Sequence, residues 1–534
     1  MTALLLPLLA AIPVMAAAVT AILPSRQAGR LVALAVPAAT AVAGVVLLVL
    51  HRSEPVIAAS VGGFVPGVAI PFVSDSFAAL MLVTTGVVAL MSLVFCDQTG
   101  EFGRSRYFAP LALLLLAGAN GALLTGDLFN LFVFVEVMLL PSYALIAMTG
   151  TWRRLGVGRL FVVINLLTST LLLAGVGFVY GTAGSVNLAV LAGAAQEDGR
   201  VAAALGVVLM ALCIKAGAVP VHGWLPRAYP GTSAGVMALF SALHTKVALY
   251  AVIRIWATAF DLDPAWGRVL LVVALVTALW GAVASASPVG AREILAWQMV
   301  SGVGVILAAL AVAQAPGGAI VYMIHHMVTI GALVMLIGAA EHVYRSGQLA
   351  GLSGLWYRER PLGVLLVLAI AALVGLPPTS GLTGKLEVVT AALGTGGAWG
   401  VATVVVVLVS SLIGLVAMLR LWRGIMWGGP APRPGDDDGD SDERQQWVDE
   451  HGGDDGDDDE DDDNDVRPSP RVPARLLVPG GVLAALSVAI FLGYGAIAPE
   501  VDRAVAGLVD TDAYVSAVLD GPDAMTDSTI GGRS

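Results

Sequence analysis

Repeated apolar runs of about 20 residues restrict the fold of this 534-residue chain more than any other feature. A run of this length can cross the hydrocarbon core of a lipid bilayer as an α-helix. The chain is 57% hydrophobic and only 13% of its residues are charged, which is more apolar surface than a soluble domain needs. The sequence therefore predicts an all-α integral membrane protein with many spans.

Arginine placement orders these runs across the membrane. We expect about 14 transmembrane helices, with approximate limits 2–23, 30–50, 74–96, 106–124, 126–149, 159–182, 200–219, 231–257, 267–287, 291–314, 318–343, 361–391, 398–421 and 474–496. Loops after odd-numbered spans carry 19 arginines, whereas loops after even-numbered spans, together with the tail, carry 5. The positive-inside rule then places odd loops in the cytoplasm and both termini outside.

The acidity of the chain belongs to one segment. Residues 430–467 hold 18 of the 39 acidic residues, so the net charge of −11 gives no information about partners of the remaining chain. Such a run repels itself and has little apolar surface to bury, which predicts a disordered cytoplasmic loop. Acidic segments of this kind are typical of salty cytoplasm, so we expect a multi-pass protein in the plasma membrane of a halophilic prokaryote.

Several functional classes find no support in the sequence. Cys96 and Cys213 lie far apart and form no metal-ligand spacing, and the chain has neither a GxGxxG motif nor a Walker loop. We therefore expect no cofactor, no bound metal and no nucleic-acid partner. Asp75 and Asp127, near span ends, are expected to cap helices or to lie at interfaces, and Arg254 is expected to extend its side chain outward.

All three lysines of the chain, Lys215, Lys246 and Lys385, lie inside long apolar runs. A buried amine can lose its proton readily, whereas arginine stays charged. A bias of the genome toward arginine would explain the absence of surface lysines, but it would not explain why these three remain in apolar surroundings. Their position indicates proton handling at membrane depth.

An acidic residue and a broken helix accompany the first lysine. Glu136 lies near the middle of the fifth span, where a carboxylate must be protonated, paired or hydrated. Pro141 lacks the amide that would bond the carbonyl of Val137, and Pro220 lacks the amide that would bond the carbonyl next to Lys215. Irregular backbone at membrane depth persists only where protein buries it or where it lines water.

Histidines supply further titratable groups. His244 lies two residues before Lys246 and so points to another face of the same helix, while His325 and His326 are adjacent in the eleventh span. A metal site is the competing hypothesis for the adjacent pair, but their side chains diverge by about 100° on a helix and no cysteine or carboxylate accompanies them. Either His325 or His326 is expected to relay protons.

A second helix break, at Pro377 and Pro378, precedes Lys385. The two broken helices are five spans apart, which predicts inverted repeats formed by spans 4–8 and 9–13. The chain then divides into N-terminal helices 1–105, a first half-channel 106–257, a second half-channel 258–425, the acidic loop 426–473, and a last helix with an external tail 474–534.

These residues resemble a known family. The stretches KAGAVPVHGWLPRAYP (215–230) and ALHTKVALY (242–250), together with VEVM (135–138) and GLPP (375–378), are similar to the proton-translocating antiporter-like membrane subunits. That family includes subunits of complex I, of membrane-bound hydrogenases and of Mrp-type sodium/proton antiporters, and the chain is most similar to the D-type subunits of the Mrp antiporters. Arg227 departs from the pattern, because many members carry an acidic residue there.

The resemblance implies a role for each residue. Glu136 and Lys215 would form the acid and base of the first half-channel, Lys246 would connect the halves, His325 or His326 would be the central relay, and Lys385 would end the second half-channel. The implied function is proton translocation in a multisubunit sodium/proton antiporter, a secondary transporter and not an enzyme, with other membrane subunits, protons and Na⁺ as partners. A redox-driven proton pump of the complex I or hydrogenase type, and a structural subunit without transport of its own, are the alternatives.

Overall fold

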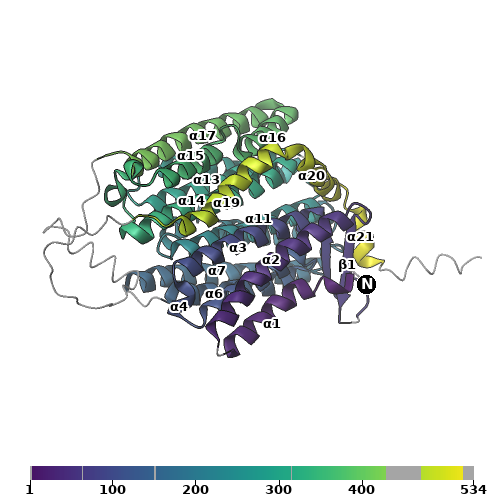
Figure 1. Cartoon of the computed structure of the whole chain (residues 1–534). Helices are drawn as coiled ribbons and strands as arrows, with labels where there is room; N and C mark the ends of the chain where they lie inside the picture. Colours follow the sequence, from purple (N-terminus) through teal and green to yellow (C-terminus); the bar gives the residue numbers. More distant parts are fainter. Residues whose placement is uncertain are drawn as a thin grey trace, which may run out of the picture.

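The structure is a bundle of membrane-length helices with one small hairpin among its described residues, and it confirms the predicted all-α membrane architecture (Figure 1). It is a computed structural model that describes residues 3–23, 25–62, 64–148, 152–313, 316–428 and 471–520. The acidic segment 430–467 lies outside the described residues. The disorder expected for the loop 426–473 therefore stays a prediction.

The elements of the first half of the chain follow in this order: η1 (Ala3–Leu5), α1 (Leu8–Ile22), α2 (Arg26–Leu50), β1 (Val56–Val61), β2 (Ile70–Asp75), α3 (Ser76–Gln98), α4 (Glu101–Arg104), α5 (Phe108–Leu124), α6 (Leu128–Ala147), α7 (Trp152–Ala183), α8 (Ala194–Glu197), α9 (Gly199–Ala216), α10 (Trp224–Ala228) and α11 (Ala234–Phe260).

The second half continues with α12 (Pro264–Ala284), α13 (Ala291–Val312), α14 (Gly317–Tyr344), η2 (Ala350–Leu352), η3 (Leu355–Tyr357), α15 (Arg360–Val374), α16 (Ser380–Thr395), α17 (Gly397–Met426), α19 (Ala474–Leu492), α20 (Tyr494–Val509) and α21 (Asp512–Leu519). Figure 1 shows α1 and α2 at one edge of the bundle and α15 to α17 at the other, with α11 between them.

Within the described residues, twelve helices are long and apolar enough to cross a membrane. Two shorter apolar helices, α5 and α15, accompany them. The predicted twelfth span, 361–391, is two helices, because α15 ends at Val374 and α16 begins at Ser380. The total of 14 crossings, the inverted repeats and the division into five regions stay predictions.

A hairpin that the sequence did not predict joins α2 to α3. Strand β1 pairs antiparallel with β2, from Val56 opposite Asp75 to Val61 opposite Ile70. Asp75 ends β2 and caps α3, since its side chain accepts the amide hydrogen of Ala78 at 2.9 Å. This placement confirms the capping role expected for Asp75.

Three helices at the centre of the bundle, α11, α13 and α14, are the most deeply buried of the described spans. Every residue of α11 from 235 to 260 is buried, and α13 and α14 are buried over most of their lengths. By contrast, α1, α2 and α17 expose many large apolar side chains, as lipid-facing helices do. The lysine of α11 and the histidines of α14 are therefore shielded from lipid by protein.

The structure contradicts the outward extension expected for the Arg254 side chain. Instead of extending outward, its guanidinium is buried and forms a two-pronged ion pair with Asp75, with distances of 2.6 and 2.8 Å. The Tyr250 hydroxyl accepts a further hydrogen bond from Arg254, at 3.1 Å. A carboxylate from the unpredicted hairpin thus stabilises the charge where it lies, so the side chain need not reach solvent.

Candidate functional site

The predicted site residues lie on five helices, one of which is the central helix α11. Glu136 is on α6, Lys215 on α9, Lys246 on α11, His325 and His326 on α14, and Lys385 on α16. Lys215, Lys246 and both histidines are almost fully buried, at 2% exposure or less. At this burial, each polar nitrogen needs a hydrogen-bond partner or water.

The first helix break begins directly after Lys215. Helix α9 ends at Ala216 because Gly217 adopts a left-handed conformation with φ of 89°, and the Ala218 amide bonds the Cys213 carbonyl at 2.9 Å. The Ile214 carbonyl accepts the Gly217 amide at 3.0 Å and also the indole N–H of Trp224 at 3.1 Å. Gly217 therefore ends the helix before Pro220 is reached, and the break leaves Lys215 in the last helical turn.

The Lys215 amine has a hydrogen-bond partner on α7 and is influenced by the charge of a carboxylate on α6. The Lys215 amine donates to the Asn165 amide oxygen of α7 at 3.3 Å, and the carboxylate whose charge acts on this amine is Glu136. One oxygen of Glu136 is buried and has no hydrogen-bond partner among the described residues. Asn165 is thus a polar contact of Lys215 that the sequence did not predict, because nothing in the local pattern of α7 marks it.

His244 is a second residue that the sequence did not place in the site. Its Nε2 is 2.7 Å from the Ser142 hydroxyl of α6, and its Nδ1 is 3.5 Å from the Tyr229 hydroxyl. The ring also packs on Phe240, with centroids 4.6 Å apart. His244 therefore links α11 to α6, the helix that carries Glu136. Its position two residues before Lys246 was the sequence feature that could have indicated this role.

Lys246 and the two histidines occupy the middle of the bundle. The Lys246 amine donates to the Thr245 hydroxyl at 3.0 Å. His325 Nδ1 lies 2.8 Å from the Ser380 hydroxyl of α16 and 3.2 Å from the Thr329 hydroxyl. Neither ring nitrogen of His326 has a hydrogen-bond partner within the described part of the chain. The adjacent histidines thus have different surroundings, as their helical spacing predicted.

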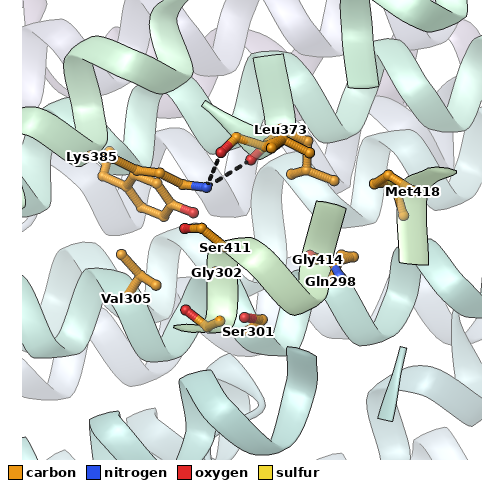
Figure 2. Close-up of a pocket in the computed structure, with 12 residues that line it drawn as sticks. Gln298, Ser301, Gly302, Val305, Leu373, Lys385, Ser411, Gly414 and Met418 are labelled. Atoms are coloured by element: carbon orange, nitrogen blue, oxygen red, sulfur yellow. Dashed lines mark hydrogen bonds between the residues drawn. The ribbon is translucent and has the colours of Figure 1, made fainter. Parts of the chain in front are cut away.

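Lys385 reaches back to the end of the helix that precedes it. Its amine donates to the carbonyls of Leu373 and Val374, at 3.2 and 2.5 Å, in the last turn of α15 (Figure 2). Helix α15 ends because Gly375 is left-handed, with φ of 95°. The amine therefore occupies the C-terminal end of a broken helix, where unpaired carbonyls and the helix dipole favour a positive charge.

A small polar cavity adjoins Lys385. Its walls come from α13, α14, α15, α16 and α17, and they are formed by Gln298, Ser301, Gly302, Val305, Tyr322, Leu373, Val374, Lys385, Ser410, Ser411, Gly414 and Met418 (Figure 2).

Chemically, the site is a series of titratable side chains, and no hydrogen bond among the described residues joins one of the three lysines directly to another titratable side chain. The hydrogen bonds of the three lysines run to Asn165, Thr245 and backbone carbonyls, so transfer of a proton from one titratable group to the next requires bridging water. Among the described residues, no group of three His, Cys, Asp or Glu side chains could hold a metal ion. The arrangement suits proton transfer better than catalysis on a bound substrate.

The chain is similar to known membrane proteins over most of its length. The family model described as "NADH:quinone oxidoreductase/Mrp antiporter, TM" matches residues 125–414. The chain is 32% identical over 468 residues to the D subunit of the Na(+)/H(+) antiporter of Bacillus subtilis (strain 168), covering 86% of this chain and 88% of that protein.

Two solved structures extend the comparison. A chain in the structure of the Mrp complex from Dietzia sp. DQ12-45-1b is 38% identical, with a TM-score of 0.87, and the match covers 96% of this chain and 99% of that one. A chain of the membrane-bound sulfane sulfur reductase, an archaeal respiratory membrane complex, is 23% identical with a TM-score of 0.80 over 97% and 100% of the two chains. At this lower identity the likeness shows the fold alone.

Proposed function

This chain belongs to the NADH:quinone oxidoreductase/Mrp antiporter membrane family, and we propose that it is the proton-translocating subunit of a multisubunit monovalent cation (Na⁺)/proton antiporter. Its relatives with the higher identities are the D subunit of an antiporter and a chain of an Mrp complex. Other membrane subunits are therefore its partners, and Na⁺ is the cation expected to exchange for protons.

The proposed proton path runs from Glu136 through Lys215, Lys246 and the histidine pair to Lys385. The observation that carries it is the placement of the lysines: Lys215 and Lys385 lie at the ends of broken helices, and Lys246 lies between them on the fully buried helix α11. Arginine would bind carbonyls and carboxylates at these places but would not release a proton. The lysines supply groups that can do both.

Charge pairing controls transfer along the first half of the path. Ionised Glu136 favours the protonated form of Lys215, since an opposite charge nearby stabilises a buried ammonium. When Glu136 takes up a proton, Lys215 loses this stabilisation and passes its own proton toward Lys246 through water.

The redox-driven alternative has weaker support. The chain of the membrane-bound sulfane sulfur reductase is 23% identical, and at this identity the likeness supports the fold but not the activity. In such a complex the redox cofactors would lie on other subunits, so this chain would use the same proton path. The structural-subunit alternative makes a different prediction from the antiporter proposal. It predicts that lysine substitutions alter assembly without altering transport by the assembled complex.

The decisive experiment measures sodium-driven dissipation of a pH gradient in vesicles that carry the whole complex. Glu136→Ala and Lys246→Ala are expected to lower the exchange rate on the order of 100-fold at equal amounts of assembled complex. Variants that assemble normally and exchange at the wild-type rate would contradict the proposal. Exchange that requires an added quinone or another electron acceptor would favour the redox-driven alternative.

The membrane orientation can be tested separately. We propose that both termini face outward, as the arginine distribution indicates. A single cysteine introduced at Ser53 or at Ser287, in a chain with Cys96 and Cys213 replaced by Ala, reports the side of two opposite loops. A membrane-impermeant thiol reagent on intact cells should label the first and not the second, and the reverse pattern would contradict the orientation.

A further inference from the structure

Thr277 is the residue of α12 that bonds the backbone of the first helix break. Its hydroxyl gives its hydrogen to the Val273 carbonyl at 2.6 Å, one turn earlier in α12, and the same oxygen accepts the amide hydrogen of Val219 at 3.1 Å. Thr277 is 0% exposed and Val219 is half-buried, and a backbone amide shielded from water is rarely left without an acceptor. This contact joins the two predicted half-channels across 58 positions of sequence.

The two helix breaks have the same local construction. Helix α9 ends at the left-handed Gly217 and α15 ends at the left-handed Gly375, with φ of 89° and 95°. The amide that follows each glycine, that of Ala218 or of Leu376, bonds a carbonyl of the preceding helical turn, at 2.9 and 2.8 Å. In both breaks a proline occupies the third position after the glycine. The same backbone pattern thus ends both helices.

The breaks differ in the residue that precedes this proline. It is Val219 in the first break and Pro377 in the second. A proline has no amide hydrogen, so the second break has no donor to satisfy at this position. The first break has one, and Thr277 supplies the acceptor from α12. This tether to α12 therefore belongs to the break that follows Lys215.

A second contact with the same face of α12 accompanies the hydrogen bond. The ring of His222, at the end of the break, packs against Trp280 of α12 and Trp297 of α13, with centroids 6.0 and 5.7 Å apart. Thr277 and Trp280 are three residues apart and so share one face of the helix. Helix α12 therefore holds the break at two positions, Val219 and His222.

Helices α12 and α13 form a closely packed pair. A Cβ atom added to Gly281 of α12 would stand 2.3 Å from the Ser301 backbone nitrogen of α13. One added to Gly304 of α13 would stand 2.2 Å from the Ala278 backbone nitrogen of α12. The Ser301 hydroxyl also donates to the Ala278 carbonyl at 2.8 Å. Helices this close have little room to slide, so α12 is a rigid anchor for the break.

The position of the Lys215 amine depends on where the break holds the end of α9. Lys215 lies two residues before Gly217 and four before Val219. Its hydrogen bond to Asn165 is 3.3 Å long, at the far end of the ordinary range of roughly 2.7–3.2 Å for such bonds. A small shift of the helix end away from α7 would therefore remove this contact.

We propose that Thr277 is a positioning residue for Lys215. By accepting the Val219 amide, Thr277 holds the break against the α12–α13 pair and fixes the last turn of α9. The Lys215 amine then stays within reach of Asn165, and Thr277 itself exchanges no proton. This inference rests on the proposed proton path, and it makes the first half of that path depend on a residue from the second half of the chain.

Thr277→Val is the primary test, in vesicles that carry the complete complex. Valine is similar in shape to threonine but cannot accept the Val219 amide hydrogen. Sodium-driven proton exchange per assembled complex should fall on the order of 10-fold, the equivalent of one lost hydrogen bond. The alkaline limb of its pH profile should move to lower pH, because a buried ammonium without its acceptor releases its proton more readily. An unchanged rate and pH profile would overturn the proposal.

Thr403→Val is the matched control, and Thr277→Ser is the conservative variant. Thr403 of α17 is also 0% exposed and donates to the carbonyl one turn earlier at 2.9 Å, but its oxygen accepts no amide from another helix among the described residues. Both variants should show the wild-type exchange rate and pH profile. The proposal is wrong if Thr277→Val behaves like Thr403→Val, or if Thr277→Ser behaves like Thr277→Val.

Val219→Pro separates positioning from the cost of an unpaired amide. The substitution copies the second break and removes the donor. Combined with Thr277→Val it leaves no unpaired amide, so the amount of assembled complex should equal that of the wild type while the shifted pH profile remains. This double variant keeps the test decisive if Thr277→Val alone assembles poorly. A wild-type pH profile in it would show that Thr277 only satisfies the amide.

Asn165→Leu tests whether Thr277 acts through Lys215. Thr277→Val added to Asn165→Leu should cause little further loss of exchange, because both changes remove the same contact of the lysine. Multiplying losses would overturn the assignment to Lys215. Failure of the whole proton path would instead appear as wild-type exchange in Glu136→Ala and Lys246→Ala, whatever the behaviour of the Thr277 variants.

Discussion

The Lys385 amine donates a hydrogen bond of 2.5 Å to the carbonyl of Val374, the last residue of α15. Lys215 lies in the last turn of α9. In the sequence one lysine precedes its helix break and the other follows it, yet the fold brings both to the C-terminal end of a broken helix. The carbonyls at the end of α15 stabilise a positive charge on Lys385 without a carboxylate, whereas the Lys215 amine donates to Asn165.

Lys385→Arg tests whether this position needs a removable proton. Arginine can still donate to the Leu373 and Val374 carbonyls but stays charged, so we expect assembly to be retained and exchange to fall on the order of 100-fold. Sodium-driven dissipation of a pH gradient in vesicles measures the rate, and blotting measures the amount of complex. An arginine variant with wild-type exchange would show that Lys385 only binds the helix end.

Trp224→Phe tests the hydrogen bond from the Trp224 indole to the carbonyl of Ile214, the residue before Lys215. The substitution removes the indole hydrogen bond to the Ile214 carbonyl but can keep ring contacts with Phe161 and Tyr229, whose centroids lie 5.7 Å from that of Trp224. We expect a loss of stability of about 1 kcal/mol, measured by thermal unfolding of the purified complex. Trp266→Phe, on an exposed position of α12, should leave the unfolding temperature unchanged.

Asp75→Asn tests the buried ion pair with Arg254. Asparagine can still cap α3, so the change isolates the loss of charge. Both side chains are 6% exposed, and an unpaired buried guanidinium should destabilise the protein by about 3–5 kcal/mol. Thermal unfolding of the complex measures this effect. Asp198→Asn, in an exposed pair that also caps a helix, is the matched control and should have little effect.

The docking of α20 should depend on pH through Glu500. Burial alone would raise the pKa of this carboxyl, but the hydrogen bonds and charges of Arg503 and Arg52 hold its pKa below the usual value for glutamate. A lowered folded-state pKa gives stability that is present above the ordinary glutamate pKa and is lost as pH falls through the folded value. Acidification should therefore loosen α20, which would lower the protection factors of its amides after correction for the pH dependence of intrinsic hydrogen exchange.

Glu500→Gln is the control for this pH effect. The glutamine side chain has no charge to lose, so the protection factors of the α20 amides should be lower than in the wild type at neutral pH and should not fall further on acidification. A pH response equal to that of the wild type would assign the effect to another group.

Much of the fold followed from the sequence, because membrane helices are recognised by their length and polarity. Helices α11 and α14 lie within a few residues of the predicted limits, since a bilayer of fixed thickness requires a run of fixed length. The hairpin of β1 and β2 was missed because it is short and lies outside the apolar runs. The outward extension predicted for Arg254 was wrong for the same reason: its partner, Asp75, lies at the end of that hairpin.

The membrane fold, the two helix breaks and the identity of the titratable residues could be predicted from the sequence, because each depends on local composition or on a proline or glycine. How these residues are held depends instead on tertiary packing. Asn165 contacts Lys215 across 50 positions of sequence, Lys385 turns back onto α15, and Gly302 of α13 leaves room for the His326 ring of α14. Such contacts depend on which helix faces pack together, and side-chain periodicity within one helix does not specify its neighbour.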